Sequence, residues 1–430
     1  MKVKKKDGIL LGLAMFAMFF GSGNVIFPPF LGLECGPQWL VGVLSYMISD
    51  IFIAMLIFVA VARIDGDVNS IARRLGEVPG KLVISIAMIC IGPLFCIPRA
   101  AATTFDMVLT PLTGAKTGSV TALIFIIAFF LLTYVLAVKP NNVCDIIGKY
   151  LTPALILFIV CLVIKGILTP IAPFSEKPMV DNVVQRGVIA GYQSMEVLGG
   201  LSVVPIFMAA VKDKGYVEKK LRVKAIVITT FVCLLCLLAA GVGMTYLGAT
   251  VSTLYDNSIS QAILVVKIAN HLFGNVGGII LGLLAGVACL ITSVALTSGT
   301  AKYFSEIYPK LSYRRIIQFC CLFGVVFAYI GLKNIIAVAV PILTLLYPLV
   351  VAMVVLSLFN DIIQKDAVFK GVAIGTLVIG VLSMLNSLGI NLQFVEMIPF
   401  FETGLGWILP AVIGGIIGQI IGKQKVLQTN

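Results

Sequence analysis

Long apolar runs alternate with short charged segments along the whole chain. A helix needs about 20 mostly apolar residues to cross a bilayer. Twelve runs reach this length, at about residues 8–33, 39–62, 80–109, 119–138, 144–168, 184–210, 223–248, 275–303, 313–331, 334–358, 367–388 and 404–422. The pattern predicts an all-α integral membrane protein with 12 transmembrane helices.

The composition excludes a water-soluble protein of this length. Only 12% of the 430 residues are charged, whereas soluble domains carry about 25%. The net charge of +12 comes from basic residues in short loops, and a nucleic-acid-binding protein would gather them on one exposed face. We therefore expect the lipid bilayer as the surroundings of the chain and no nucleic acid as a partner.

The distribution of basic residues predicts the orientation. Lys and Arg are enriched in cytoplasmic loops of membrane proteins, and most of the 31 fall on one side if the N-terminus is inside. We predict a multi-pass protein of the cell membrane with both termini in the cytoplasm. Residues 259–273 have helical spacing but are too short to span, so we expect an amphipathic helix on the outer face.

Two of the predicted helices contain poor helix formers at mid-span. The first carries Gly21-Ser22-Gly23-Asn24, and the sixth carries Gly191-Tyr192-Gln193-Ser194 followed by Glu196. Irregular backbone inside a bilayer is tolerated only where protein buries it or where it lines a cavity. We predict that helices 1 and 6 are broken at these points.

The two breaks lie five helices apart, so the second set of five crosses the membrane in the opposite sense. Matching interrupted helices in two halves indicate an inverted-repeat transporter with its binding site at the breaks. We predict one transporter domain, residues 1–430, with a five-plus-five inverted repeat. The first repeat covers residues 8–168, the second covers 184–358, and two C-terminal helices follow within 367–422.

The ends of broken helices offer two kinds of binding group. A half-helix N-terminus presents free N–H groups to an anion such as a carboxylate. A half-helix C-terminus presents free carbonyl oxygens to an ammonium group or a sodium ion. A zwitterionic amino acid needs both.

Five segments resemble the branched-chain amino acid:cation symporters of bacteria, also called branched-chain amino acid transport system II carriers. They are FFGSGNVIFPP (residues 19–29), IGPLFCIPRAAATTF (91–105), GYQSMEVLGGL (191–201), ACLITSVALTSGTAKYF (288–304) and FETGLGWILPAVIG (401–414). The resemblance implies the leucine-transporter fold. It also implies uptake of leucine, isoleucine and valine with Na⁺ or, in some members, H⁺, by secondary active transport with alternating access.

The resemblance places the substrate at the two breaks. The carboxylate is expected at the amides and hydroxyl of the first break, and the amine at carbonyls around Phe20 and the second break, with Glu196 nearby. The predicted substrate-binding residues are Phe20, Gly21, Ser22, Gly23, Asn24, Gly191, Tyr192, Gln193, Ser194 and Glu196. An ion pair between Glu196 and Arg99 is an alternative role for that carboxylate.

The fold also implies a sodium site between helices 1 and 8. The matching residues are Ala17 and Phe20 through their carbonyls, with Cys289, Thr292 and Ser293, which share one helix face. Val294, Thr297 and Ser298 have the same spacing and form a rival set. The paired hydroxyls favour Na⁺ as the coupling ion. H⁺ is the alternative, because Glu196 is a carboxylate that can bind a proton.

No metal cluster, nucleophile elbow or phosphate-binding loop occurs in the sequence. We therefore expect a transporter and not an enzyme, with branched-chain L-amino acids as its partners and no obligatory protein partner. A transporter of another small solute with the same fold is the remaining alternative.

Overall fold

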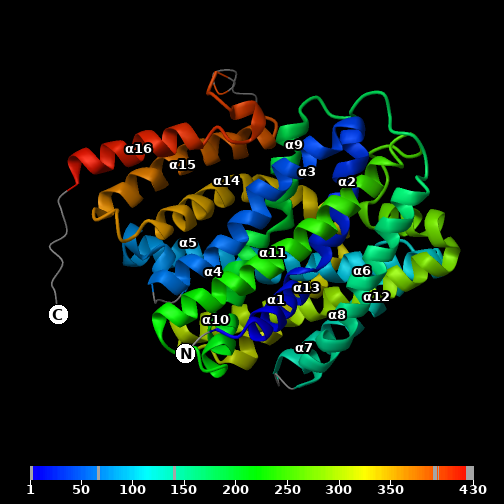
Figure 1. Ribbon diagram of the computed structural model, residues 1–430, viewed down its shortest axis with the longest axis horizontal. Coiled ribbons are helices and arrows are strands. Elements are labelled where there is room, and N and C mark those ends of the chain that lie inside the picture. The colour runs from blue at the N-terminus through cyan, green and yellow to red at the C-terminus, as the bar shows by residue number, and fades with distance from the viewer. Residues whose placement is uncertain (1–2, 65–67, 139–141, 391–394, 396, 423–430) are drawn as a thin grey trace.

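The computed structural model describes residues 3–64, 68–138, 142–390, 395 and 397–422. Within these residues the regular secondary structure is all helix, as the apolar runs predict, and turns or irregular segments connect the helices. The longer helices are α1 (Lys5–Phe19), α2 (Ser22–Cys35), α3 (Trp39–Tyr46), α4 (Phe52–Ile64), α5 (Glu77–Ile89), α6 (Cys96–Thr113), α7 (Val120–Val138), α8 (Asn142–Leu168), α9 (Val183–Ser194), α10 (Glu196–Asp213), α11 (Lys219–Ala249), α12 (Gln261–Ile307), α13 (Tyr313–Tyr329), α14 (Leu332–Leu358), α15 (Asp366–Ser387) and α16 (Ile408–Ile421) (Figure 1).

Eight helical segments of the described chain are long and apolar enough to cross a membrane. The count of 12 spans is not confirmed by these lengths and stays a prediction, as do the repeat boundaries. The surface supports a membrane location, because α7 exposes Ile124, Leu131 and Val135 by 60% or more. Apolar side chains exposed along a helix of this length suit contact with lipid.

Helices 1 and 6 are broken where the sequence predicts. Predicted helix 1 is divided into α1 and α2, and predicted helix 6 into α9 and α10. Two further irregular turns are π-helical. The turn η2 (Met47–Ile51) was not predicted, whereas η5 (Cys90–Leu94) contains Gly92 and Pro93, which disfavour a regular helix. The predicted helix at 259–273 is present as the first part of α12, which changes direction at Gly274.

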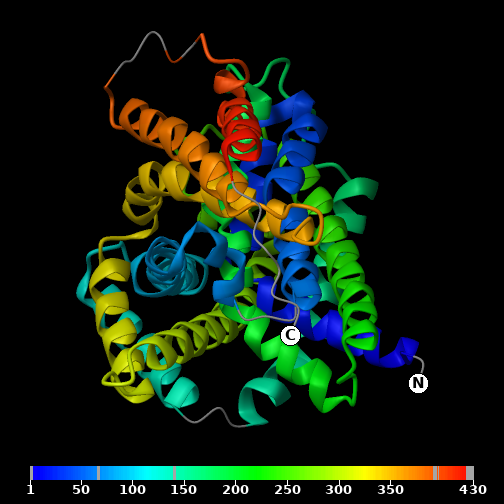
Figure 2. The ribbon, with the colours of Figure 1, turned by 90° about the vertical axis from the view of Figure 1, so that its left-hand side faces the viewer.

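Helix α11 packs along both halves of the first broken helix. Gly32 of α2 and Gly248 of α11 let the backbones touch, because a Cβ on Gly248 would lie 1.8 Å from the carbonyl oxygen of Pro29. Helices α15 and α16 lie side by side at one end of the molecule (Figures 1 and 2). The residues of the two breaks, such as Ser22, Ser194 and Glu196, are buried in the interior of the bundle.

Candidate functional site

The first break leaves the N-terminus of α2 uncapped. The amide of Gly21 donates to Phe19 O at 2.8 Å, and the first helical bond of α2 runs from Val25 N to Gly21 O at 3.3 Å. No side chain caps this helix. The amides of Ser22, Gly23 and Asn24 therefore point out of the helix end, where the helix dipole favours an anion.

Glycine is needed at the first break because other helices approach it closely. A Cβ on Gly21 would lie 2.8 Å from Thr292 Oγ1 of α12, and one on Gly23 would lie 2.9 Å from Ser194 Oγ of α9. Both distances are too short for a real side chain. The first break thus contacts both the second break and the hydroxyl-bearing face of α12.

The second break turns at a single residue. Met195 has φ 66° and ψ 26° and ends α9 while preceding α10. A non-glycine residue in this left-handed conformation costs on the order of 1–2 kcal/mol, so the packing around it must hold it there. The turn leaves the last carbonyls of α9 and the first amides of α10 without helical partners.

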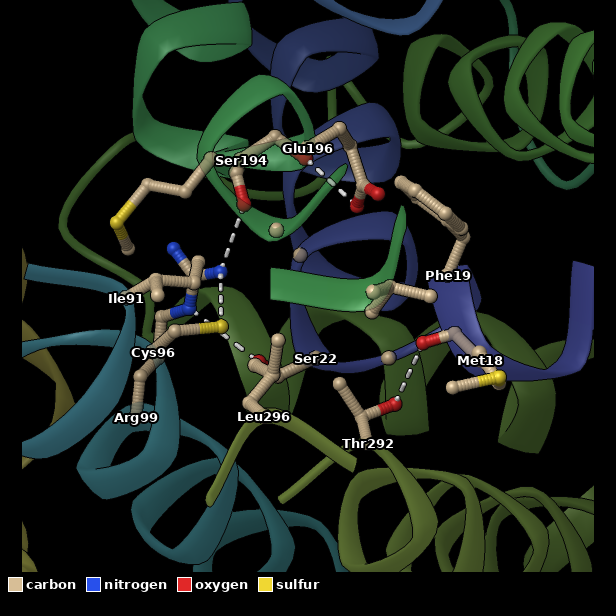
Figure 3. A pocket seen from close by; sticks show the side chains of 15 residues that line it. Met18, Phe19, Ser22, Ile91, Cys96, Arg99, Ser194, Glu196, Thr292 and Leu296 are labelled. Atoms are coloured by element: carbon tan, nitrogen blue, oxygen red, sulfur yellow. Dashed lines mark hydrogen bonds between the residues drawn. The ribbon is translucent and has the colours of Figure 1, made fainter. Parts of the chain in front are cut away.

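Arg99 of α6 occupies the C-terminal end of α9. Its guanidinium is buried and donates to the carbonyl oxygens of Gln193 and, at 2.9 Å, Ser194. It also donates to Ser22 Oγ at 3.2 Å (Figure 3). The sequence predicts these α9 carbonyls as partners of the substrate amine, but in this structure a resident cation binds them.

Glu196 does not form the ion pair with Arg99 that the sequence offers as an alternative. Its Oε1 accepts from Asn24 Nδ2 at 2.7 Å and from Ser194 Oγ at 3.4 Å. Asn24 Nδ2 also donates to Phe19 O at 2.9 Å. The carboxylate therefore links the two breaks through Asn24, and it remains among the residues that line the cavity.

A narrow cavity lies at the breaks, with about 20 Å³ open to the centre of a water molecule. That space holds about one water. The lining residues are Met18, Phe19, Gly21, Ser22, Gly23, Ile91, Cys96, Arg99, Ser194, Met195, Glu196, Gly199, Val203, Thr292 and Leu296 (Figure 3). An amino acid needs more room, so the helices must separate before one can bind.

Only some of the predicted substrate residues line this cavity. Gly21, Ser22, Gly23, Ser194 and Glu196 do, whereas Phe20, Asn24, Gly191, Tyr192 and Gln193 lie outside the lining set.

Gly191 and Tyr192 face other helices. A Cβ on Gly191 would lie 2.3 Å from Ser49 Oγ of η2. The ring of Tyr192 packs 4.6 Å from that of Tyr347 of α14. Both positions therefore fit packing around the second break.

The predicted sodium ligands lie where α12 passes the first break. Thr292 Oγ1 donates to Met18 O at 3.4 Å, and the fully buried Ser293 Oγ has no hydrogen-bond partner. Because Gly21 N donates to Phe19, the Ala17 carbonyl loses the amide that a continuous helix would give it. These oxygens fit a hard cation.

The remaining predicted ligands do not decide between the two sets. Phe20 lies at the break and Cys289 is fully buried on α12. In the rival set, Thr297 Oγ1 is also buried without a partner. Both sets therefore stay open.

Sequence reasoning missed part of the site. The apolar wall formed by Ile91, Val203 and Leu296 carries no distinctive motif, because such residues occur throughout the chain. Asp50 of η2, which accepts from Val197 N at 3.2 Å, was also missed. Its signal was present, since a carboxylate within an apolar run is rare and usually functional.

Comparison with known proteins agrees with this architecture. A transporter of the nucleobase-cation-symport-1 family, Mhp1, with bromovinylhydantoin bound, has a TM-score of 0.62 and 13% identity over 96% of this chain and 93% of its own. MhsT in complex with L-phenylalanine has a TM-score of 0.61 and 15% identity over 95% and 98%. At these identities the likeness establishes the fold alone, which is that of the leucine transporter.

Relatives with similar sequences span almost the whole chain. The branched-chain amino acid permease BraB of Bacillus subtilis is 32% identical over 435 residues, covering 98% of each chain. The permease BrnQ of Escherichia coli K12 is 29% identical, covering 97% of this chain and 96% of its own. The family described as "Branched-chain amino acid transport protein" matches residues 4–425. This chain therefore belongs to that family of integral membrane transporters and is not an enzyme.

Proposed function

We propose that this protein is a secondary active transporter that carries branched-chain amino acids into the cell together with a cation. One observation carries the proposal: the uncapped N-terminus of α2 opens onto a cavity whose wall is largely apolar. A zwitterion with an aliphatic side chain needs an anion site beside a dry pocket. The names of the sequence relatives support the same substrate class.

The carboxylate of the substrate binds at the first break. The amides of Ser22, Gly23 and Asn24 supply N–H donors and the positive end of the α2 dipole. Arg99 lies against Ser22 at 3.2 Å and adds a positive charge to the same region. Glu196 and the free α1 carbonyls are the groups left for the ammonium, because Arg99 binds the α9 carbonyls.

The side chain binds toward the apolar wall. Ile91, Val203 and Leu296 line the cavity and present no hydrogen-bonding side-chain atom. One methylene more or less in such a pocket changes binding by only about 1–3 kcal/mol. Selection among leucine, isoleucine and valine is therefore loose, whereas a charged side chain is rejected because its charge would be desolvated.

The coupling cation in this proposal is Na⁺. The ion would lie between α1 and α12. Its ligands would come from Thr292, Ser293, the Ala17 and Phe20 carbonyls and the position of Cys289. A bound ion would join these two helices next to the substrate. Binding of both then stabilises one arrangement of the bundle over the other, which is the requirement for coupled alternating access.

Reconstituted vesicles test the proposal. Radiolabelled leucine uptake into proteoliposomes should rise when Na⁺ is higher outside than inside, compared with an equal K⁺ gradient. Unlabelled isoleucine and valine should compete, and lysine and glutamate should not. An absence of leucine uptake, or competition by every solute alike, would contradict the proposed substrate.

A pair of double variants tests the ion site. Thr292→Ala/Ser293→Ala should abolish the response to the Na⁺ gradient, while Thr297→Ala/Ser298→Ala serves as the matched control on the same helix. If only the control pair loses the response, the ion binds the rival set instead.

A further inference from the structure

Asp50 is a fully buried carboxylate that the proposed transport mechanism does not use. It lies in the π-helical turn η2, between α3 and α4, with none of its surface exposed. Its Oδ1 accepts from the hydroxyl of Tyr347 of α14 and from Val197 N of α10 at 3.2 Å. Its Oδ2 has no hydrogen-bond partner. A buried carboxylate oxygen without a donor is costly, which indicates that another group satisfies it during function.

Asp50 lies close to Glu196, the carboxylate of the cavity. The amide that Asp50 accepts from belongs to Val197, which is the residue next to Glu196. The hydroxyl of Ser194 connects the same elements, since it accepts from Tyr46 of α3 at 3.1 Å and donates to Glu196 at 3.4 Å. The two carboxylates therefore share one buried region, with Glu196 facing the cavity and Asp50 behind it.

This region carries more negative than positive charge. The other titratable or charged side chains around the two carboxylates are Tyr46 of α3, Cys96 and Arg99 of α6, Tyr192 of α9, Cys233 of α11 and Tyr347 of α14. Arg99 is the permanent cation among them, and its donors go to backbone carbonyls, Ser22 and Cys96. One cation cannot balance two buried carboxylates, so a second positive charge is required.

The geometry indicates a proton as that charge. A metal ion such as Na⁺ needs about five or six oxygen ligands, whereas Asp50 Oδ2 has no hydrogen-bond partner within bonding distance among the described residues. A proton needs one carboxylate oxygen. Two neighbouring buried carboxylates commonly share a single proton for this reason.

We propose that Asp50 and Glu196 form a proton-binding pair that holds one proton in the loaded carrier and moves it across the membrane with the amino acid, in addition to the Na⁺ proposed above. The proposal rests on the function proposed above. An O–H bond forms on a carboxylate oxygen when hydronium gives up its proton on the outer side. The bond breaks when water takes the proton on the inner side. The proton enters through Glu196, which lines the cavity.

Protonation also changes how α10 is held. The ionised Asp50 accepts from the Val197 amide at the N-terminus of α10, where a negative charge is favoured by the helix dipole. A neutral Asp50 binds this helix end more weakly. The proton thus loosens α10 from η2 and α14 in the loaded state.

The test measures protons and leucine in the same vesicles. Proteoliposomes contain a trapped pH-sensitive dye and have equal Na⁺ and equal pH on both sides. Adding leucine to the wild type should acidify the interior, with about one proton for each leucine. In Asp50→Asn this ratio should fall at least tenfold. Asp106→Asn is the matched control, because Asp106 is a buried carboxylate of α6 that faces Ser260 at 3.4 Å and lies outside the pair.

The outcomes separate the two proposals. A wild type that takes up leucine without acidification overturns the proton pair and leaves the proposed function intact. A wild type that takes up no leucine overturns the proposed function itself. An unchanged ratio in Asp50→Asn, or an equal loss in Asp106→Asn, also overturns the pair.

A second variant covers the case in which Asp50→Asn does not fold. Tyr347→Phe removes one donor to the ionised Asp50 but keeps the carboxylate. The pH midpoint of leucine-driven proton uptake should rise by about one pH unit, because the anion loses a hydrogen bond. An unchanged midpoint would count against the pair.

Discussion

Arg99 and Asp50 place opposite charges at the two ends of the second break. Arg99 donates to the last carbonyls of α9, where the helix dipole is negative. Asp50 accepts from the Val197 amide at the N-terminus of α10, where the helix dipole is positive. Each charge would be costly alone in the interior of a membrane protein. Their positions offset part of this cost and hold Met195 in its left-handed conformation.

A substitution at Gly23 tests the contact between the two breaks. A Cβ there would lie 2.9 Å from Ser194 Oγ and 3.2 Å from Arg99 Nη2. We expect Gly23→Val to lower leucine uptake at least ~tenfold, since small displacements of binding groups cost this much. The measurement is radiolabelled uptake, normalised to the protein present in the membrane.

Gly241 of α11 provides the control for Gly23. A Cβ on Gly241 would meet only Met47 Cε, at 2.9 Å, and this flexible end of a side chain can move aside. Gly241 does not line the cavity. We expect Gly241→Ala to keep uptake within about twofold of the wild type. Normal uptake in Gly23→Val would show that the first break does not bind the substrate.

For single residues, the sequence reveals some features of the site and leaves others hidden. Gly21-Ser22-Gly23-Asn24 could be identified because poor helix formers are rare at mid-span. The partners of Arg99 could not, because they are backbone carbonyls 94 and 95 residues away. A carbonyl looks the same at every position of a sequence, so only the fold reveals which ones Arg99 reaches.

At the scale of elements, glycine contacts determine how closely helices approach. Gly371 of α15 and Gly414 of α16 face each other, and a Cβ on either would lie 2.0–2.1 Å from the carbonyl oxygen of the other. A glycine contact of the same kind lets α2 and α11 approach closely at Gly248. Small residues at helix interfaces are the usual means of close packing in membranes.

Gly248 tests this packing. A Cβ on Gly248 would lie 1.8 Å from Pro29 O, which is backbone and cannot move aside. We expect Gly248→Ala to separate α2 from α11 and to destabilise the fold by about 1–3 kcal/mol. The measurement is the thermal melting midpoint of the purified protein in detergent, again with Gly241→Ala as the control. An unchanged midpoint would mean that the two helices can separate at little cost.

Some of the helix breaks could be predicted from the sequence, and the reason is physical. Helix breaks that need glycine or polar residues leave a compositional trace, and both were found. The π-helical turn η5 carries Gly92 and Pro93, which leave a trace of the same kind. The turn η2 lies in an apolar run without glycine or proline, so the local sequence does not distinguish it from ordinary helix.

At the scale of the whole molecule, the predicted outer side of the site is closed. Glu34 at the end of α2 pairs with Arg186 of α9, with 2.5 Å between Oε2 and Nε. The loop before α9 adds a bond from Met179 N to Glu34 O at 2.8 Å. Val203 and Leu296, which line the cavity, lie on the cytoplasmic side of the second break and of Thr292 in the predicted orientation.

Breaking this ion pair should favour outward opening. Cys35 is fully buried beside Glu34, so its labelling reports the separation of α2 from its neighbours. In Glu34→Gln we expect labelling by a membrane-impermeant maleimide added outside to rise about threefold or more, because a mostly buried pair is lost. The same variant with Cys35→Ser gives the background. Equal labelling with and without the ion pair would exclude Glu34 and Arg186 as a latch.

The charges around the second break bear on the slowest part of a carrier's cycle. After release, the protein must return with no amino acid bound, and any helix end left without a partner would make that return costly. Arg99 stays with the chain and stabilises the α9 end whether or not a ligand is present. The α9 end of the second break therefore stays stabilised in the empty protein throughout its return.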